Sequence, residues 1–297
     1  MTIRHLRIFV AVAELGNMHR AAEQLFIAQS TVSQAIREIE ENYGIKLFER
    51  LSRRIYLTET GTLLLSYARH ILHSVDEMEH ALHHRAQLPS LRLGGSVTVG
   101  TCLLDRVIDT LNQLCPGADV FVTINNTSVV ETLLLQNKLD AAIVEGIVTD
   151  PELLQVPVLR DELVITAGKN HPLFQAKSLQ LADLEGMDFI SRETGSADRN
   201  QFEQLLSDRG IQIVRKWQCT NTEAIKNAVV RGRGLAILSR FLIEEELEKG
   251  LLKILPLTDV QVLRTLHLVY HKNKYLSPIM LALQTACAEL SASQTGQ

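Results

Sequence analysis

The chain has 297 residues, enough for two or three domains of ordinary size. Its hydrophobic content of 46% and charged content of 22% are those of a folded globular protein, which excludes a disordered chain. The formal net charge is only −4, so the chain as a whole has no general attraction to nucleic acid.

No apolar run reaches the roughly 18 to 20 residues that a membrane span needs. The amphipathic N-terminal segment lacks the small-residue cleavage site of a secretory signal. The four cysteines are scattered without CxxC spacing, which predicts neither a zinc site nor a disulfide framework. We therefore expect a cytoplasmic protein that has no membrane association and no metal or cofactor.

The basic residues gather near one end of the sequence. Residues 1–58 contain eight Lys and Arg against six acidic residues, and four of these cations lie within 46–54. Attraction to phosphate is screened over about 10 Å at ordinary salt, so a local basic cluster matters more than the net charge. The cluster is compatible with DNA binding, although a charge run is more often a solvated face.

Apolar spacing predicts three helices at the start of the chain. The first covers 3–15 and ends at Gly16, a short one covers 19–26, and the third has Ser30 as its predicted N-cap and ends at Gly44. A short helix, a tight turn and a second helix are typical of a helix-turn-helix that reads the major groove. The outward polar residues of the third helix are the candidate DNA contacts: Gln29, Ser30, Thr31, Ser33, Gln34 and Arg37.

The segment after the third helix predicts a wing. Arginines cluster ahead of a strand predicted over 55–57, and a basic loop between two short strands can contact phosphate or enter the minor groove. The candidates are Arg50, Arg53 and Arg54. Any one of them could be a plain surface group, but three beside a helix of this kind favour DNA contact.

The run AAEQLFIAQSTVSQAIREIEENYGIKLFERLSRRIYLTETG resembles the winged helix-turn-helix signature of the LysR family of transcriptional regulators. Three departures exist. Asn17-Met18-His19 stands where Ser-Phe-Thr is commoner, Leu51 replaces a small polar residue, and Thr60 replaces the usual Ala. The first departure bears on the capping of the second helix. None removes a groove-facing polar residue, so the resemblance implies sequence-specific binding to double-stranded promoter DNA.

A long helix is predicted over 59–88. Apolar residues three and four apart form the seam of a coiled coil: Leu64, Ala68, Ile71, Val75, Met78 and Leu82. The resemblance implies that the same helix of a second subunit covers this seam, giving a homodimer and then a homotetramer. The alternative is packing against the chain's own domain. His80 and His84 have the spacing of a metal pair, but no HExxH pattern accompanies them, so exposed histidines are expected.

From residue 91 strands alternate with helices, which predicts an α/β architecture with parallel sheets. The predicted strands are 97–100, 120–125, 140–146, 162–168, 188–191, 235–239 and 266–271. LysR sensor domains resemble periplasmic solute-binding proteins, in which two α/β lobes hold a ligand between the carboxyl ends of their strands. The expected division is 1–58 for the DNA-binding domain, 59–88 for the linker helix, and 91–297 for the effector-binding domain. Within the last, lobe one covers about 91–162 and 265–297, and lobe two about 163–264.

Hydroxyl-bearing turns at the predicted helix starts favour an anion site. The effector pockets of the family draw on these turns, so the resemblance gives seven candidates: Thr101, Cys102, Thr127, Ser128, Arg192, Ser196 and Thr222. Each Ser or Thr could instead be a plain N-cap. We expect a small anionic effector of unknown identity, with Arg192 as its charge partner. A thiol at a helix N-terminus has a lowered pKa, so oxidant sensing by Cys102 is the alternative.

The mechanism that the resemblance implies is positional. Effector binding between the lobes changes subunit packing, re-spaces the paired DNA modules and alters DNA bending. RNA polymerase is a further candidate partner, and activation is the expected direction, although the sequence leaves repression open. One rival is an enzyme, but no GxSxG, P-loop, GxGxxG or metal-ligand motif is present. The other is an architectural DNA binder with an inactive sensor half.

Overall fold

The computed structural model describes all residues except 52–53, 84–88, 147 and 296–297. The chain divides into two compact units, which are described one at a time. The first consists of Met1–Gln87 with the short segments Leu135–Asn137 and Asn273–Tyr275, and the second contains the rest of the chain.

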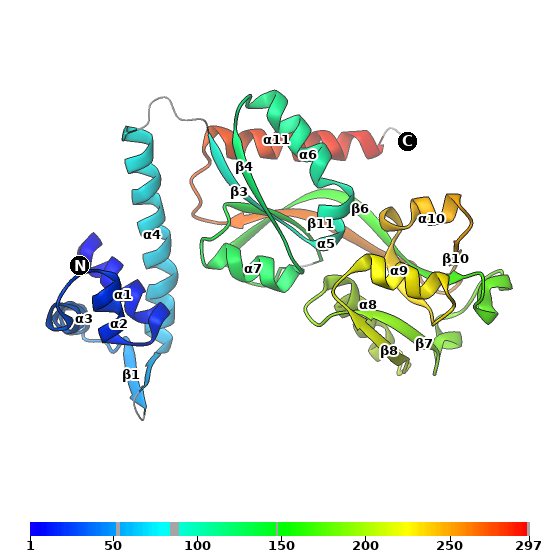
Figure 1. Ribbon diagram of the computed structural model, residues 1–297, viewed down its shortest axis with the longest axis horizontal. Helices are drawn as coiled ribbons and strands as arrows, with labels where there is room; N and C mark the ends of the chain where they lie inside the picture. The colour runs from blue at the N-terminus through cyan, green and yellow to red at the C-terminus, as the bar shows by residue number, and fades with distance from the viewer. Residues whose placement is uncertain (52–53, 84–88, 147, 296–297) are drawn as a thin grey trace. The chain divides into compact units, whose positions relative to one another are not determined.

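The first unit is a winged helix-turn-helix followed by a long helix (Figure 1). Its elements are α1 (Ile3–Leu15), α2 (Met18–Gln24), α3 (Gln29–Tyr43), β1 (Phe48–Leu51), β2 (Arg54–Leu57) and α4 (Glu59–His83). Strands β1 and β2 form an antiparallel hairpin. The three short helices share one core, in which Phe9 and Val12 of α1 meet Val32 and Ile39 of α3.

Two helix starts in this unit differ in how they are capped. Asn17 caps α2, because its side chain accepts hydrogen bonds from the backbone N–H groups of His19 and Arg20. The departure from the commoner residues at this position therefore leaves α2 capped. The prediction that Ser30 caps the third helix is wrong: α3 begins at Gln29, and its N-cap Ala28 makes no side-chain hydrogen bond.

The predicted seam of α4 divides between two environments. Leu64 and Ala68 pack against the core of their own unit. Further along, Ile71 and Met78 are exposed in the single chain, 40% and 54% respectively, and Val75 is half-buried. The side chain of Leu82 lies outside the described residues, as do that of His80 and the whole of His84. The first part of the seam therefore packs against the chain's own domain, which was the alternative prediction. The later part is exposed in the single chain and could contact a partner.

The turn between α2 and α3 carries an unusual residue. Phe26 has a φ of 54°, in the left-handed region, and its side chain is 95% exposed. The backbone N–H of Ile27 donates to the carbonyl of Ala22 at 3.0 Å, and that of Phe26 donates to Glu23 at 3.2 Å. This is the helix ending in which glycine is usual at the left-handed position, because a Cβ there is strained.

The second unit is a mixed α/β fold built on one seven-stranded sheet of order β10-β6-β11-β5-β3-β4, in which β9 also pairs with β6. A separate parallel pair joins β7 to β8. The strands are β3 (Ser90–Gly95), β4 (Asp119–Ile124), β5 (Ala141–Glu145), β6 (Leu153–Gly168), β7 (Asp188–Arg192), β8 (Val214–Cys219), β9 (Ala236–Ser239), β10 (Leu252–Leu255) and β11 (Val262–His271). The α-helices are α5 (Val97–Cys102), α6 (Leu104–Leu114), α7 (Thr127–Leu135), α8 (Ala197–Asp208), α9 (Thr222–Val230), α10 (Glu244–Glu248) and α11 (Pro278–Thr295).

Two lobes with separate cores share the large sheet. In what we call lobe one, α6 and α11 pack on one face of the sheet around Leu111 and Leu283 (Figure 1). In lobe two, one core forms around Phe189 and Phe202, and a second forms under α9. The long strands β6 and β11 pair antiparallel and contribute to the cores of both lobes. The lobes are therefore joined by a continuous two-stranded ribbon.

Two predictions for this unit need correction. Residues 97–100 are not a strand but lie in helix α5, because Ser96 caps it by accepting a hydrogen bond from the N–H of Val99. The strand before it is β3. The sheets are also not wholly parallel: β3 pairs in parallel with β4 and β5, whereas β6, β9, β10 and β11 pair antiparallel. Within the part of the chain that the structure describes, no helix is long and apolar enough to cross a membrane.

We predict that Phe26→Gly stabilises the protein. The exposed ring loses no packing, and glycine removes the strain of a Cβ at positive φ, a gain of about 1 kcal/mol. Phe26→Ala is the matched control, because it removes the ring but keeps the strained Cβ. Urea unfolding of the three proteins compares their free energies of unfolding. A glycine variant no more stable than the alanine variant would contradict the strain argument.

Candidate functional site

The exposed face of α3 holds the candidate DNA contacts. Gln29, Ser30, Gln34 and Arg37 are exposed, and Thr31 and Ser33 are half-buried. The opposite face is buried in the core of the unit. The side chain of Gln34 donates to the carboxylate of Glu38 at 2.8 Å. The structure thus places the predicted residues along the first turns of one helix, the part that enters the groove in a helix-turn-helix.

The end of α3 is joined to the segment that leads into the wing by one half-buried carboxylate. Glu40 accepts hydrogen bonds from the backbone N–H of Leu47 and from Lys46 Nζ, both at 2.8 Å. Although burial acts to raise it, these hydrogen bonds lower the pKa of Glu40 below its ordinary value. Arg50 and Arg54 belong to β1 and β2, but their side chains, like the whole of Arg53, lie outside the described residues. Their contact with DNA stays a prediction.

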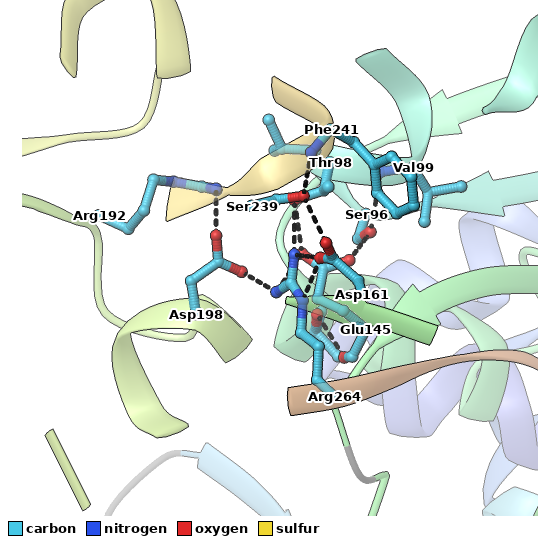
Figure 2. A network of polar contacts seen from close by, with 12 residues as sticks. Ser96, Thr98, Val99, Glu145, Asp161, Arg192, Asp198, Ser239, Phe241 and Arg264 are labelled. Atoms are coloured by element: carbon cyan, nitrogen blue, oxygen red, sulfur yellow. Dashed lines mark hydrogen bonds and ion pairs between the residues drawn. The ribbon is translucent and has the colours of Figure 1, made fainter. Parts of the chain in front are cut away.

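In the second unit, polar side chains from both lobes converge on one buried arginine (Figure 2). Arg264, on β11, bonds Asp161 of β6 at 2.6 Å through its guanidinium, and the two residues are direct cross-strand partners. It also pairs with Asp198, in the first turn of α8. Although burial opposes it, the surrounding carboxylates raise the pKa of Arg264, so it stays charged. All three side chains are no more than 2% exposed.

Glu145, the last residue of β5, completes this cluster from lobe one. Its carboxyl accepts hydrogen bonds from the hydroxyls of Ser96 and Thr98, at the start of α5, and lies 3.9 Å from Arg264 Nη1. Burial and the negative charge of Asp198 raise the pKa of Glu145 to about 7, against the opposing effect of Arg264. A carboxyl with this pKa is partly protonated at neutral pH.

A second buried arginine faces the cluster from lobe two. Arg192, at the end of β7, donates to both carboxylate oxygens of Glu193, at 2.9 and 3.0 Å. Its remaining nitrogen, Nη1, has no hydrogen-bond partner and lies 3.9 Å from Asp198 Oδ2, which is also unpartnered. The hydroxyls of Ser196 and Thr222 are likewise buried without a partner. Unsatisfied buried groups are rare in native proteins and call for a water, an ion or a ligand.

A cavity of about 730 Å³ opens beside the cluster. It lies between the N-termini of α7 and α8, and the hydroxyl of Ser128 crosses from one lobe to donate to the carbonyl of Gly195 in the other at 3.2 Å. The cavity is lined by Thr127, Ser128, Glu131, Gly146, Thr149, Gly195, Ala197, Asn200, Gln201, Leu263, Arg264, Thr265 and His267. Two helix N-termini directed at one space favour negative charge there.

The seven predicted effector residues do not all meet at this cavity. Thr127 and Ser128 line it, at the start of α7. Arg192 and Ser196 belong to the loop leading into α8, and Thr222 begins α9. Thr101 and Cys102 lie at the C-terminal end of α5, not at a helix start, and line a different cavity with Arg106, Lys226 and several glutamates. Ser96 and Thr98 lie at the start of this helix, where Thr101 and Cys102 were predicted.

Sequence reasoning missed the charged residues at the centre of the site. Glu145 ends an apolar strand in which every residue is buried, and Arg264 lies on a strand whose alternate residues are buried. A charge within such a run is a signal of a buried, paired group, because unpaired charges are too costly to bury. Asp198 gave no such signal, since an acidic residue in a first helical turn is ordinary.

Comparison with known proteins identifies both halves of the chain. Residues 84–292 match the LysR substrate binding domain, and residues 3–62 match the bacterial regulatory helix-turn-helix protein, lysR family. The chain belongs to the LysR family of transcriptional regulators. Its fold is therefore the one expected from the sequence, an N-terminal winged helix-turn-helix, a long linker helix and a C-terminal two-lobed α/β domain. Proteins of this family bind promoter DNA and form oligomers.

Individual LysR family members are similar over most of the chain. A probable RuBisCO transcriptional regulator of Synechocystis sp. is 34% identical over 93% of this chain and 82% of its own. Full-length OxyR of Pseudomonas aeruginosa has the same fold, with a TM-score of 0.68 and 21% identity over 98% of this chain and 94% of its own. The CcmR regulatory domain of Synechocystis, in complex with 2-PG, covers 68% of this chain and 97% of its own, with a TM-score of 0.64 and 25% identity. The chain is thus a DNA-binding regulator with an effector-binding domain.

Three cysteines of the sensor unit, Cys102, Cys219 and Cys287, are predicted to be slow to react. Burial raises the pKa of Cys102 to about 11, and the nearby charges of Asp161 and Glu244 act in the same direction. Burial also raises the pKa of Cys219, and that of Cys287 to about 12. Because the thiolate is the nucleophile, Cys102 and Cys287 should be alkylated at least about 10-fold more slowly at pH 7.5 than in the urea-unfolded protein, and Cys219 should also be slowed. Mass spectrometry after timed iodoacetamide treatment measures this. Fast labelling of Cys102 in the native protein would restore the oxidant-sensing alternative.

Proposed function

We propose that this LysR family regulator binds a small anionic metabolite between the two lobes of its sensor unit, and that binding changes how the paired DNA modules grip a promoter. The observation that carries the proposal is the convergence of the α7 and α8 N-termini on one cavity beside Arg264. Two helix N-termini that meet at one cavity favour a carboxylate or another oxyanion. The complex of the CcmR regulatory domain with 2-PG supports small-molecule binding by this domain.

The contacts of the effector are proposed from both lobes. Thr127 and Ser128 supply hydroxyls from lobe one, and Ser196 and Thr222 supply unpartnered hydroxyls from lobe two. Arg192 keeps only Nη1 for the effector, because its other donors hold Glu193. We therefore propose that Arg192 contacts the effector through Nη1.

For DNA binding, we propose that the first turns of α3 enter the major groove and that the wing contacts the backbone. Residues 1–58 form the DNA-binding domain, 59–88 the linker and 91–297 the sensor in this proposal. RNA polymerase is a further proposed partner, and activation is the proposed direction, in keeping with a 30% identical relative named as the transcriptional activator CmpR. We infer no catalytic activity, since the sequence contains no GxSxG, P-loop, GxGxxG or metal-ligand motif.

We also propose that two chains pair through α4 and that dimers then form a tetramer through the sensor units. The exposed apolar side chains Leu63, Tyr67, Ile71 and Met78 lie on one face of α4, as the spacing of four, four and seven residues dictates. In the sensor unit, β4 is an edge strand with Phe121 68% exposed, and β8 is an edge strand with Trp217 47% exposed. In a second copy of opposite orientation, β8 of that copy would lie beside β4 of the first, and β4 of that copy beside β8 of the first.

The experiment that tests the function is footprinting on DNA upstream of the regulator's own gene and on a RuBisCO promoter, with and without small organic anions, over a range of salt. We expect a two-part protected region whose pattern changes with one anion. Gln34→Ala should weaken specific binding by about 1–3 kcal/mol, the cost of losing one base contact. Asn42→Ala, an exposed amide at the far end of the same helix, is the control and should bind like the wild type. No sequence-specific protection would contradict the proposal.

The dimer proposal predicts that Ile71→Asp separates the subunits, because it places a charge in the apolar face of α4. Light scattering after gel filtration should show a smaller particle, and operator affinity should fall as the two half-sites are no longer bound together. Glu79→Ala changes an exposed residue outside that face and should leave both properties unchanged. If the Ile71→Asp variant has the same particle size as the wild type, the proposal that subunits pair through α4 is contradicted.

A further inference from the structure

We propose that Glu145 of lobe one and Asp198 of lobe two share a single proton, and that closing the two lobes binds this proton. The proton would then be a second ligand of the sensor unit, bound at the lobe junction beside the effector cavity. Where an anionic effector closes the lobes, as the proposed function has it, the proton would be taken up together with the effector.

The geometry joins the two lobes through carboxyl groups. Glu145 ends β5 of lobe one, and Asp198 begins α8 of lobe two, and both lie against the guanidinium of Arg264 (Figure 2). Glu145 Oε1 is 3.9 Å from Arg264 Nη1, the same nitrogen that bonds Asp198. The negative charge of Asp198 also acts on Glu145 and raises its pKa, whereas Glu145 is one of the causes that lower the pKa of Asp198. The two carboxyls thus meet around one nitrogen, each at most 2% exposed.

The charges at the junction do not balance without a proton. Among the described residues, the ion pairs of the junction join four carboxyl groups to two guanidinium groups. The carboxyls are those of Glu145, Asp161, Glu193 and Asp198, and the guanidinium groups are those of Arg192 and Arg264. An uncompensated buried charge is costly, and a carboxyl in that position takes up a proton instead. Two buried carboxyls beside the same guanidinium nitrogen cannot both ionise readily, so the first proton is bound tightly.

Among the four carboxyls, Glu145 is the one best placed to hold the proton. Glu193 is held by two hydrogen bonds from Arg192. Asp161 accepts hydrogen bonds from three groups: the guanidinium of Arg264, the hydroxyl of Ser239 and the backbone N–H of Glu162. Asp198 is flanked by both guanidinium groups, which lower its pKa although burial opposes them. Within the described part of the chain, the side chains that donate to Glu145 are the hydroxyls of Ser96 and Thr98, and these can also serve a neutral carboxyl.

The direction of the pH effect follows from this assignment. The pKa of Glu145 is raised to about 7 in the closed lobes, from an ordinary value of 4.5. The closed form therefore holds the proton more tightly than a form in which water reaches Glu145. The stabilisation is fully present below about pH 4.5 and is lost as the pH rises through about 7. Alkaline conditions should favour opening.

His267 is the other titratable group to separate from this effect. It lies on β11, three residues beyond Arg264, and lines the cavity. Burial lowers its pKa, so its protonation belongs to a more acidic range than that of Glu145. His267→Gln removes it without touching the carboxyl pair.

Infrared difference spectroscopy on the full-length protein tests the proposal, because a protonated carboxyl has a C=O stretch that a carboxylate lacks. We expect a buried carboxyl band that disappears with a midpoint near pH 7. The band should be absent in Glu145→Gln and retained in His267→Gln and in Glu248→Gln, an exposed control on α10. In Asp198→Asn the like charge is gone, so the midpoint should move to lower pH.

Thermal unfolding supplies an independent readout. The melting temperature of the wild type should fall between pH 5 and pH 8 as Glu145 loses its proton. Glu145→Gln is neutral at every pH, so its melting temperature should not show this fall. A carboxyl band that persists in Glu145→Gln, or a midpoint unmoved in Asp198→Asn, would overturn the shared proton. Neither measurement involves DNA or a metabolite, so the proposed regulatory function stands or falls on its own test.

Discussion

The sensor unit depends on the ion pair between Arg264 and Asp161, which lie opposite each other on the two strands that run through both lobes. The pair is at most 2% exposed, so neither charge could be buried there without the other. Everything else at the junction is arranged around it. Asp198 reaches the guanidinium from α8, Glu145 reaches it from β5, and Ser239 completes the shell of Asp161. The cavity between the α7 and α8 N-termini takes one of its walls from the same arginine.

A junction of this kind combines stability with the capacity to change. Breaking a buried pair by removing one partner typically costs about 3–5 kcal/mol, which holds the ribbon together. The contact that Glu145 makes from lobe one is less complete, since its Oε1 lies 3.9 Å from Arg264 Nη1, a nitrogen that is hydrogen-bonded to Asp198 of lobe two. Movement of the lobes would therefore spare the Arg264–Asp161 pair and act on the looser contacts. A ligand can shift such an equilibrium only as far as it prefers one arrangement over the other.

Prediction from sequence succeeded where local signals decide the structure. Gly16 and Gly44 end α1 and α3 in the left-handed conformation, and apolar periodicity gave the buried faces of both helices. It failed at 97–100, where Val-Thr-Val favours a strand but the Ser96 cap and packing in lobe one give a helix. Because of that error, Thr101 and Cys102 were predicted at a helix start in the candidate site, whereas they lie at the C-terminal end of α5. The charged cluster was out of reach for another reason: Glu145, Asp161, Asp198 and Arg264 are far apart in the sequence, and only the fold brings them together. The seam of α4 was found from its period, but its division between the chain's own core and an open face depends on tertiary packing.

The ribbon of β6 and β11 limits how this protein can change over evolution. Side chains alternate between the two faces of a strand, so one residue inserted or deleted on either strand turns every later side chain to the opposite face. Such a change between the lobes would carry Arg264 or Asp161 out of the junction and leave its partner as an uncompensated buried charge. The ribbon already contains one irregularity in register, between Leu266 and His267, two residues beyond Arg264. Homologous sensors should therefore accept many substitutions along these strands but conserve their lengths between that irregularity and the arginine, while insertions accumulate in the loops.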